Sequence, residues 1–302
     1  MAFPDNPPPA PDPSEGFQLK MGPFFMEPSG EIELFTKYQL DNEENIEVNR
    51  IEVQISNFSH HFIIYDYEGA ANSVPDGYRF DQDHTQDISF VASVAASSDI
   101  QLPEKTAYFW GPNHVLDLNS HYINFDTDKV YQSEAYVNVY FQDSGIALHE
   151  MKSNLIPNFR IDVPNTGEII TETAQVRYAP FLEGVVPDEA FVWNIGGHTH
   201  RYGAGYKIWT TKDNQKDELI YDGSCPGGVP GCVAPFFDYQ HIPIRQWDEF
   251  LYVDFKEGLF HEAQYINDGP ESVAWGPTSK DEMMLFGVFY ICLLYTSDAA
   301  DE

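Results

Sequence analysis

The chain has 302 residues, 42% of them hydrophobic and 15% aromatic, which suffices for two ordinary domains or one large domain with a substantial core. It carries 48 Asp and Glu against 16 Lys and Arg, and the resulting net charge of −32 repels nucleic acid and anionic membranes. No stretch approaches the roughly 20 apolar residues of a membrane span. We therefore expect neither a nucleic-acid partner nor a membrane span.

Residues 1–16 are rich in Pro and Asp and resemble a linker. This opening lacks the basic and apolar regions of a signal peptide, so we expect a truncated N-terminus that has lost a signal or another domain. The acidic composition suits a protein that works in salt. We expect an extracellular or periplasmic location, or the lumen of the secretory pathway.

Short runs rich in aromatic and β-branched residues follow, and Pro, Gly, Asn and Asp separate them. In the first half these runs are 31–40, 46–56, 61–67, 88–94 and 136–142. In the second half they are 169–178, 189–195, 205–210, 218–221, 250–255, 259–267 and 283–291. The pattern predicts an all-β fold of two tandem antiparallel jelly-roll-like β-sandwich domains.

A Pro- and Asn-containing stretch at 157–166 indicates the domain boundary, which gives domains at 17–160 and 161–291. Residues 292–302 are typical of translated sequencing-adapter read-through. We expect this tail to be non-native, and it carries no functional argument.

The chain has three cysteines, too few for a disulfide framework. Cys225 and Cys232 flank a Gly- and Pro-rich segment that could close into a small loop. The spacing leaves open whether the two form a bridge or remain thiols. Neither lies between histidines, which argues against a blue-copper site with two His and one Cys.

The most informative motif is His198-Thr199-His200, which follows two glycines. Side chains alternate along a strand, so the two imidazoles would project from one face. Met283 and Met284 begin a later apolar run, and their positions leave open whether either is a ligand or packs in the core. Two imidazoles and a thioether would form a soft site that suits Cu(I) better than calcium or magnesium.

A second group of histidines lies upstream, at His60-His61 and His121. Neighbouring residues of a regular strand point to opposite faces, so His60 and His61 could share a metal only at a strand end or bulge. His84, His114, His149 and His261 read as surface or packing residues.

Two other site types remain open. A cupin would place a Glu shortly after the His-Thr-His motif, but Arg201 and Tyr202 follow it here. A single zinc or iron would need a further ligand, for which His241 is the local candidate.

Taken together, the motifs resemble the copper type II, ascorbate-dependent monooxygenases, the family of peptidylglycine α-hydroxylating monooxygenase and dopamine β-monooxygenase. The order is an early His-His, a later His-Tyr, then His-Thr-His, then Ser-x-Asp-Glu-Met, and the resemblance covers residues 17–291. It implies an enzyme with two copper ions per chain, ascorbate as reductant and O2 as co-substrate.

The resemblance also implies the ligands. His60, His61 and His121 look like the ligands of an electron-transfer copper. His198, His200 and Met283 look like those of an oxygen-binding copper, and thus like the catalytic residues. Met283 is preferred to Met284 because it directly follows Asp281-Glu282.

The substrate pocket departs from the amidating enzyme's pattern. Gly196 replaces the Arg that anchors a substrate carboxylate there, and Leu285 and Gly287 replace its supporting Asn and Tyr. Met284 replaces a cysteine of the family's disulfide pattern. We therefore expect hydroxylation of a small organic or amine-bearing molecule and not of a peptidyl-glycine. The alternatives are a non-catalytic copper- or sugar-binding jelly-roll protein and a single-metal zinc or iron enzyme.

Overall fold

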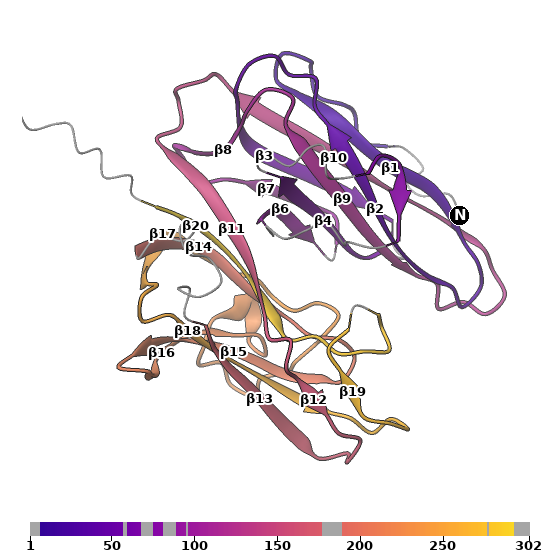
Figure 1. Ribbon diagram of the computed structural model, residues 1–302, viewed down its shortest axis with the longest axis vertical. Coiled ribbons are helices and arrows are strands. Elements are labelled where there is room, and N and C mark those ends of the chain that lie inside the picture. The colour runs from indigo at the N-terminus through magenta and orange to yellow at the C-terminus, as the bar shows by residue number, and fades with distance from the viewer. Residues whose placement is uncertain are drawn as a thin grey trace, which may run out of the picture. The chain divides into compact units, whose positions relative to one another are not determined.

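The computed structural model describes residues 7–56, 59–67, 75–80, 89–94, 96–176, 189–276 and 278–292. Within these ranges the only helical element is a 3-10 turn at Pro226–Gly228, and strands make up most of the rest (Figure 1). The all-β class predicted from the sequence is confirmed. The described ranges hold no helix with the length and apolar character that a membrane crossing requires.

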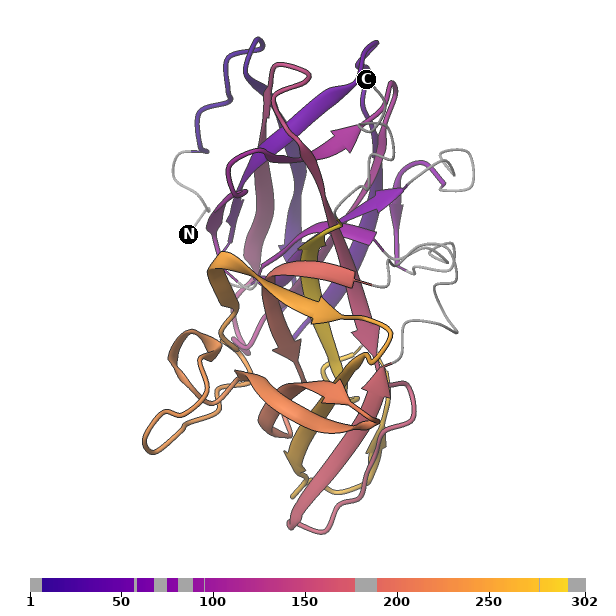
Figure 2. The ribbon, with the colours of Figure 1, turned by 90° about the vertical axis from the view of Figure 1, so that its left-hand side faces the viewer.

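The chain divides into two compact units, Met1–Lys152 and Ser153–Glu302. The described strands form a nine-stranded, a five-stranded, a four-stranded and a two-stranded sheet, and both views of the ribbon show extended strands throughout each unit (Figures 1 and 2). Almost all strand pairs are antiparallel, and the described exceptions are β8 with β11 and a single bridge between Trp275 and Glu282.

One sheet of the first unit follows the order β1–β10–β3–β8, and β7 also pairs with β3. Their bounds are Gly16–Met26 for β1, Tyr131–Gln142 for β10, Ile46–Ile55 for β3, Thr106–Trp110 for β8 and Ser98–Gln101 for β7. The second sheet follows the order β5–β2–β9–β4–β6, with bounds Tyr78–Arg79, Glu31–Gln39, Val115–Ile123, Ser59–Tyr67 and Ser89–Val94. This second sheet carries His60, His61 and His121.

Strand β11 (His149–Pro157) begins in the first unit, where it pairs with β8, and ends in the second. The second unit then has β14 (Glu189–His198) between β20 (Leu285–Ile291) and β17 (Arg245–Asp254). Its other main sheet has the order β13–β18–β15–β16, with bounds Ile169–Val176, Leu259–Ile266, Gly203–Lys212 and Gln215–Asp222. A short pair joins β12 (Asp162–Val163) and β19 (Val273–Ala274).

Strand β14 lies between two other strands of its sheet and is buried at four consecutive positions, 192–195. Val192 and Ile195 are buried in the core of the second unit, together with Tyr206 and Ile208 of β15 and Phe286 of β20. Gly197 is required at the end of β14 because a Cβ atom there would lie 2.4 Å from Cδ1 of Tyr206. Close packing of β14 against β15 therefore fixes the chain just before His198.

Several strands were not predicted, among them β1, β8, β9 and β11. The most consequential is β9, which carries His121 and is buried along nearly its whole length, although polar residues occupy alternate positions in it. The bridge between Cys225 and Cys232, left open by the sequence, is present. Residues 1–6 of the expected linker and 293–302 of the expected non-native tail lie outside the described ranges.

Candidate metal centres

The neighbouring histidines His60 and His61 lie at a β-bulge. Strand β4 pairs with β9 through Ser59 and Tyr122, and then through His61 and His121, so that His60 is the extra residue on the β4 side. A bulge interrupts the alternation of side chains and allows two adjacent residues to face the same region. This is the arrangement that joint ligation by His60 and His61 requires.

The bulge brings three imidazoles together. One potential ligand atom from each of His60, His61 and His121 lies within 4.8 Å of the others, and no fourth residue joins this cluster among the described residues. The ring centroids are 5.5 Å apart for His60 and His61, 5.2 Å for His60 and His121, and 5.1 Å for His61 and His121. Three converging imidazoles could hold one transition-metal ion.

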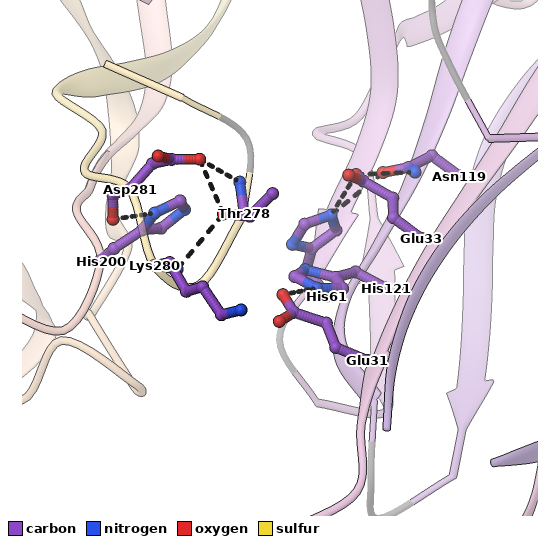
Figure 3. Close-up of polar contacts among 9 residues, drawn as sticks. All are labelled: Glu31, Glu33, His61, Asn119, His121, His200, Thr278, Lys280 and Asp281. Atoms are coloured by element: carbon purple, nitrogen blue, oxygen red, sulfur yellow. Dashed lines mark hydrogen bonds and ion pairs between the residues drawn. The ribbon is translucent and has the colours of Figure 1, made fainter. Parts of the chain in front are cut away.

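Hydrogen bonds orient two of these rings (Figure 3). Nε2 of His121 lies 2.8 Å from Oε1 of Glu31, and Nε2 of His61 lies 3.0 Å from Oδ1 of Asn119 and 3.5 Å from Oε1 of Glu33. Asn119 donates from Nδ2 to the same Glu33 oxygen at 3.1 Å. Nδ1 of His121 is buried and has no hydrogen-bond partner among the described residues. An orphaned nitrogen of this kind fits a metal ligand.

The electrostatics favour the neutral form of the His121 imidazole and the ionised form of the Glu33 carboxylate. Burial lowers the pKa of His121, and the neighbouring His61 lowers it further, against the opposing effect of Glu33 and Glu31. Burial would by itself raise the pKa of Glu33, but its hydrogen bond with His61 and the charges of His61 and His121 bring the net pKa below its usual value. Neutral imidazole is the form that binds a metal.

The second candidate centre lies at the end of β14. His198 is the last residue of that strand, and the centroids of the His198 and His200 rings are 5.3 Å apart. The motif was expected on a strand, but β14 ends at His198, and Thr199 and His200 lie beyond it, both buried. Nδ1 of His200 donates to the backbone oxygen of Asp281 at 3.0 Å (Figure 3), which leaves Nε2 as the nitrogen with a lone pair.

A buried carboxylate links His200 to the segment that contains Met283. Oε2 of Glu282 accepts from the backbone nitrogens of His200 at 2.9 Å and Met283 at 3.1 Å, and Oε1 accepts from that of Tyr202 at 2.8 Å. Burial raises the pKa of Glu282 to about 7, while these backbone hydrogen bonds and the charge of Arg201 act in the opposite direction. A nearby cation would favour the ionised form.

The two methionines have different surroundings. Met284 is completely buried, belongs to the hydrophobic core, and its sulfur accepts from Nδ2 of Asn158 at 3.4 Å. Met283 is partly exposed, and its backbone oxygen accepts from the hydroxyl of Tyr265 at 2.7 Å. Strand β20 begins only at Leu285, two residues later than the predicted start of the run. Met284 thus has a packing role, and Met283 is the methionine whose side chain is accessible.

The remaining histidines divide into packing and surface positions, except that His84 lies outside the described residues. His261 is fully buried and its Nδ1 lies 2.6 Å from the Tyr206 hydroxyl. His114 stacks on Trp110 and lies 2.7 Å from Asp66, and His149 is partly exposed at the start of β11. His241 has 71% of its side chain exposed and pairs with Asp238 of its own loop.

Sequence reasoning missed Glu31, Glu33 and Asn119, which contact the first cluster, and the role of Glu282 in the second. Glu31 and Glu33 alternate with apolar residues and so look like the solvent face of an ordinary strand. The relevant signal is the pairing of β2 with β9, which sets Glu33 directly opposite His121. No pattern local to either strand contains that information.

No protein-family model and no curated protein matches the chain. Among solved structures, a recombinant N-glycanase F (PNGase F) is 8% identical with a TM-score of 0.39, over 91% of this chain and 95% of that chain. PBCV-1 VP54, fitted into a reconstruction of the virophage Sputnik, is 7% identical with a TM-score of 0.28, over 91% and 93%. A triple jelly-roll protein of an archaeal virus turret is 7% identical with a TM-score of 0.23, over 96% and 60%. These likenesses are too weak to bear on function.

Proposed function

We propose that the protein is a copper-dependent monooxygenase. It hydroxylates a C–H bond of a small organic or amine-bearing substrate with O2 and a one-electron donor such as ascorbate. The observation that carries the proposal is the convergence of His60, His61 and His121 at the β4 bulge. The packing of an apolar core in a β-sandwich gives no reason for three histidines from two strands to converge.

The two donor sets point to copper as the metal. Imidazoles suit zinc, copper, iron and nickel, whereas a thioether favours Cu(I). His198, His200 and Met283 would hold one copper, and His60, His61 and His121 would hold the other. Copper at these positions would supply one-electron redox chemistry and the activation of dioxygen.

The residues around the ligands hold protons at defined atoms. Glu31 and Asn119 accept from Nε2 of His121 and His61, and the Asp281 carbonyl accepts from Nδ1 of His200. Each imidazole is thereby kept in one tautomer and one orientation, which is the usual role of the groups behind metal-ligating histidines. Glu282 performs the corresponding task for the backbone of His200 and Met283.

The disulfide between Cys225 and Cys232 supports a location in an oxidising compartment. We accordingly place the protein in the extracellular space, the periplasm or the secretory lumen. This location also suits a reaction that consumes O2 and a small reductant.

The proposal is tested by elemental analysis of the copper-loaded protein together with oxygen consumption on addition of ascorbate. We expect two coppers per chain and ascorbate-dependent uptake of O2. His121→Ala and His200→Ala should each lose one copper and the uptake, whereas the matched control His241→Ala should retain both. One metal per chain without uptake would overturn the proposal and favour a binding protein or a single-metal enzyme.

A further inference from the structure

We propose that Glu31 and Glu33 are positioning residues that hold His121 and His61 through Nε2 and make the metal site of the first unit prefer a divalent over a monovalent ion. The inference rests on the proposed function only in taking copper as the metal. The carboxylates themselves, their contacts and the strand register are independent of that assignment.

The strand register explains why two carboxylates face the histidines. Glu33 on β2 is the direct cross-strand partner of His121 on β9, and Glu31 is two residues earlier, on the same face of β2. His61 on β4 is the partner of His121 on the other side. Strand β9 thus lies between an acidic strand and a histidine strand, and Figure 3 shows both carboxylates beside the rings.

The contacts determine which nitrogen can bind a metal. An ionised carboxylate only accepts hydrogen bonds, so the 2.8 Å contact of Glu31 with Nε2 of His121 places the proton on Nε2. The lone pair of the neutral ring is then on Nδ1, the buried nitrogen without a hydrogen-bond partner among the described residues. Glu33 fixes His61 directly and through Asn119, whose amide donates to Glu33 and whose oxygen faces Nε2 of His61.

The charges determine which ion is preferred. Three neutral imidazoles contribute no net charge, and the two carboxylates contribute two negative charges behind the ligands. A divalent ion brings the sum to zero, whereas a monovalent ion leaves it at minus one. Glu31 and Glu33 are largely shielded from solvent, with 27% and 24% of their side chains exposed, so solvent screens this difference only in part.

The second candidate centre provides an internal contrast. There Nδ1 of His200 faces a neutral backbone carbonyl, that of Asp281. The nearby carboxylate, Glu282, accepts from three backbone nitrogens instead of an imidazole. The described contact of the His200 ring is thus with a neutral group, whereas those of His121 and His61 include carboxylates, and removing Glu31 or Glu33 should act on the first site.

The test compares Glu31→Gln and Glu33→Gln with the wild-type full chain and with Glu43→Gln, which removes the same charge from an exposed position. Competition titrations with chelators measure the affinities for Cu(II) and Cu(I) separately. We expect each glutamine variant to lose about 10- to 100-fold in Cu(II) affinity at one site per chain, which is the usual effect of removing a group behind a metal ligand. The Cu(I) affinity should fall less, and Glu43→Gln should match the wild type.

An equal loss for both oxidation states, or no loss, would overturn the preference for a divalent ion. A second measurement needs neither a variant nor a metal, so it stays informative if a glutamine variant fails to fold. Nitrogen-15 chemical shifts of the wild-type apoprotein should show His121 with its proton on Nε2. A proton on Nδ1 would overturn the positioning role. If the Cu(II) preference is found but ascorbate drives no oxygen uptake, the proposed function fails and this inference stands.

Discussion

His200 and Met283 donate their backbone N–H groups to the same atom, Oε2 of Glu282, over 2.9 and 3.1 Å. The contact extends the register of the sheet beyond its last pair. His198 pairs with Leu285 at the end of the β14–β20 ladder, and His200 and Met283 each lie two residues beyond that pair. Beyond the end of the ladder, the Glu282 carboxylate joins the two segments through hydrogen bonds from the backbone of His200 and Met283.

Replacing Glu282 by Gln should loosen this junction. The amide has one acceptor oxygen for three backbone donors, and its NH2 group would face an N–H group. We expect a loss of roughly 1 to 3 kcal/mol in the free energy of unfolding, the usual cost of leaving buried donors unsatisfied. Denaturant titration would measure it.

Elemental analysis of the Glu282→Gln protein should in addition show weakened binding of one copper per chain. The matched control is Glu271→Gln, an exposed residue of the same unit, which should leave both properties unchanged. Normal stability and normal copper content in Glu282→Gln would contradict the role assigned to the carboxylate.

Alanine substitutions of the two methionines should have different effects, one on stability and the other on metal binding. Met284→Ala removes a completely buried core side chain and should cost about 2 to 5 kcal/mol, with copper content retained in the folded protein. Met283→Ala removes a partly exposed side chain and should leave the melting temperature nearly unchanged, while Cu(I) affinity at one site and oxygen uptake fall. Full oxygen uptake by Met283→Ala would show that its thioether is not a ligand.

The adjacent glycines before His198 should respond differently to alanine. A Cβ at Gly197 would lie 2.4 Å from the Tyr206 ring, so Gly197→Ala should cost roughly 1 to 3 kcal/mol through overpacking. At Gly196 the nearest atom would be Cγ1 of Ile244 at 3.3 Å, in an exposed side chain that can move, and the change should stay within about 0.5 kcal/mol. Thermal unfolding of both variants measures the difference, and equal melting temperatures would contradict the close packing of β14 on β15.

The sequence predicted the fold class and many of the strands, among them the alternating strand β3. It missed β9, although Asp117, Asn119 and His121 occupy alternate positions there. Alternation of this kind predicts that the polar face meets solvent, whereas these three side chains are buried. The partners of the first histidine cluster were not foreseen because a sequence pattern does not show that a polar face is buried.

The sequence indicated the histidines of the two candidate sites but not the residues that contact them. Residue types and order nominated six candidate ligands, and the structure brings His60, His61 and His121 together and places His198 beside His200. The copper assignment and the activity stay predictions. The roles of Glu31 and Glu282 depend on contacts between residues about 80 to 90 positions apart, which a single sequence does not reveal.

Stability should depend on pH through His261. Burial lowers its pKa from the usual 6.5 to about 3, so between these values the unfolded chain binds a proton that the folded chain does not. The contribution of His261 is complete above pH 6.5 and is lost as the pH falls toward 3. Within that window it should add a slope of up to about 1.4 kcal/mol per pH unit to the free energy of unfolding.

The measurement is denaturant unfolding of the wild type and His261→Phe from pH 4 to pH 7. The variant loses the contact with Tyr206 at every pH, so the difference between the two slopes isolates the titration of His261. Parallel curves would contradict a strongly lowered pKa.

The bulge at His60 means that the first site depends on chain length as well as on residue identity. In an uninterrupted strand His60 and His61 would point to opposite faces, and the extra residue in β4 is what would allow them to share one ion. A related sequence could keep all three histidines and still lose their convergence if one residue beside His60 were deleted. When related chains are compared, the number of residues in β4 is therefore as informative as the ligands it carries.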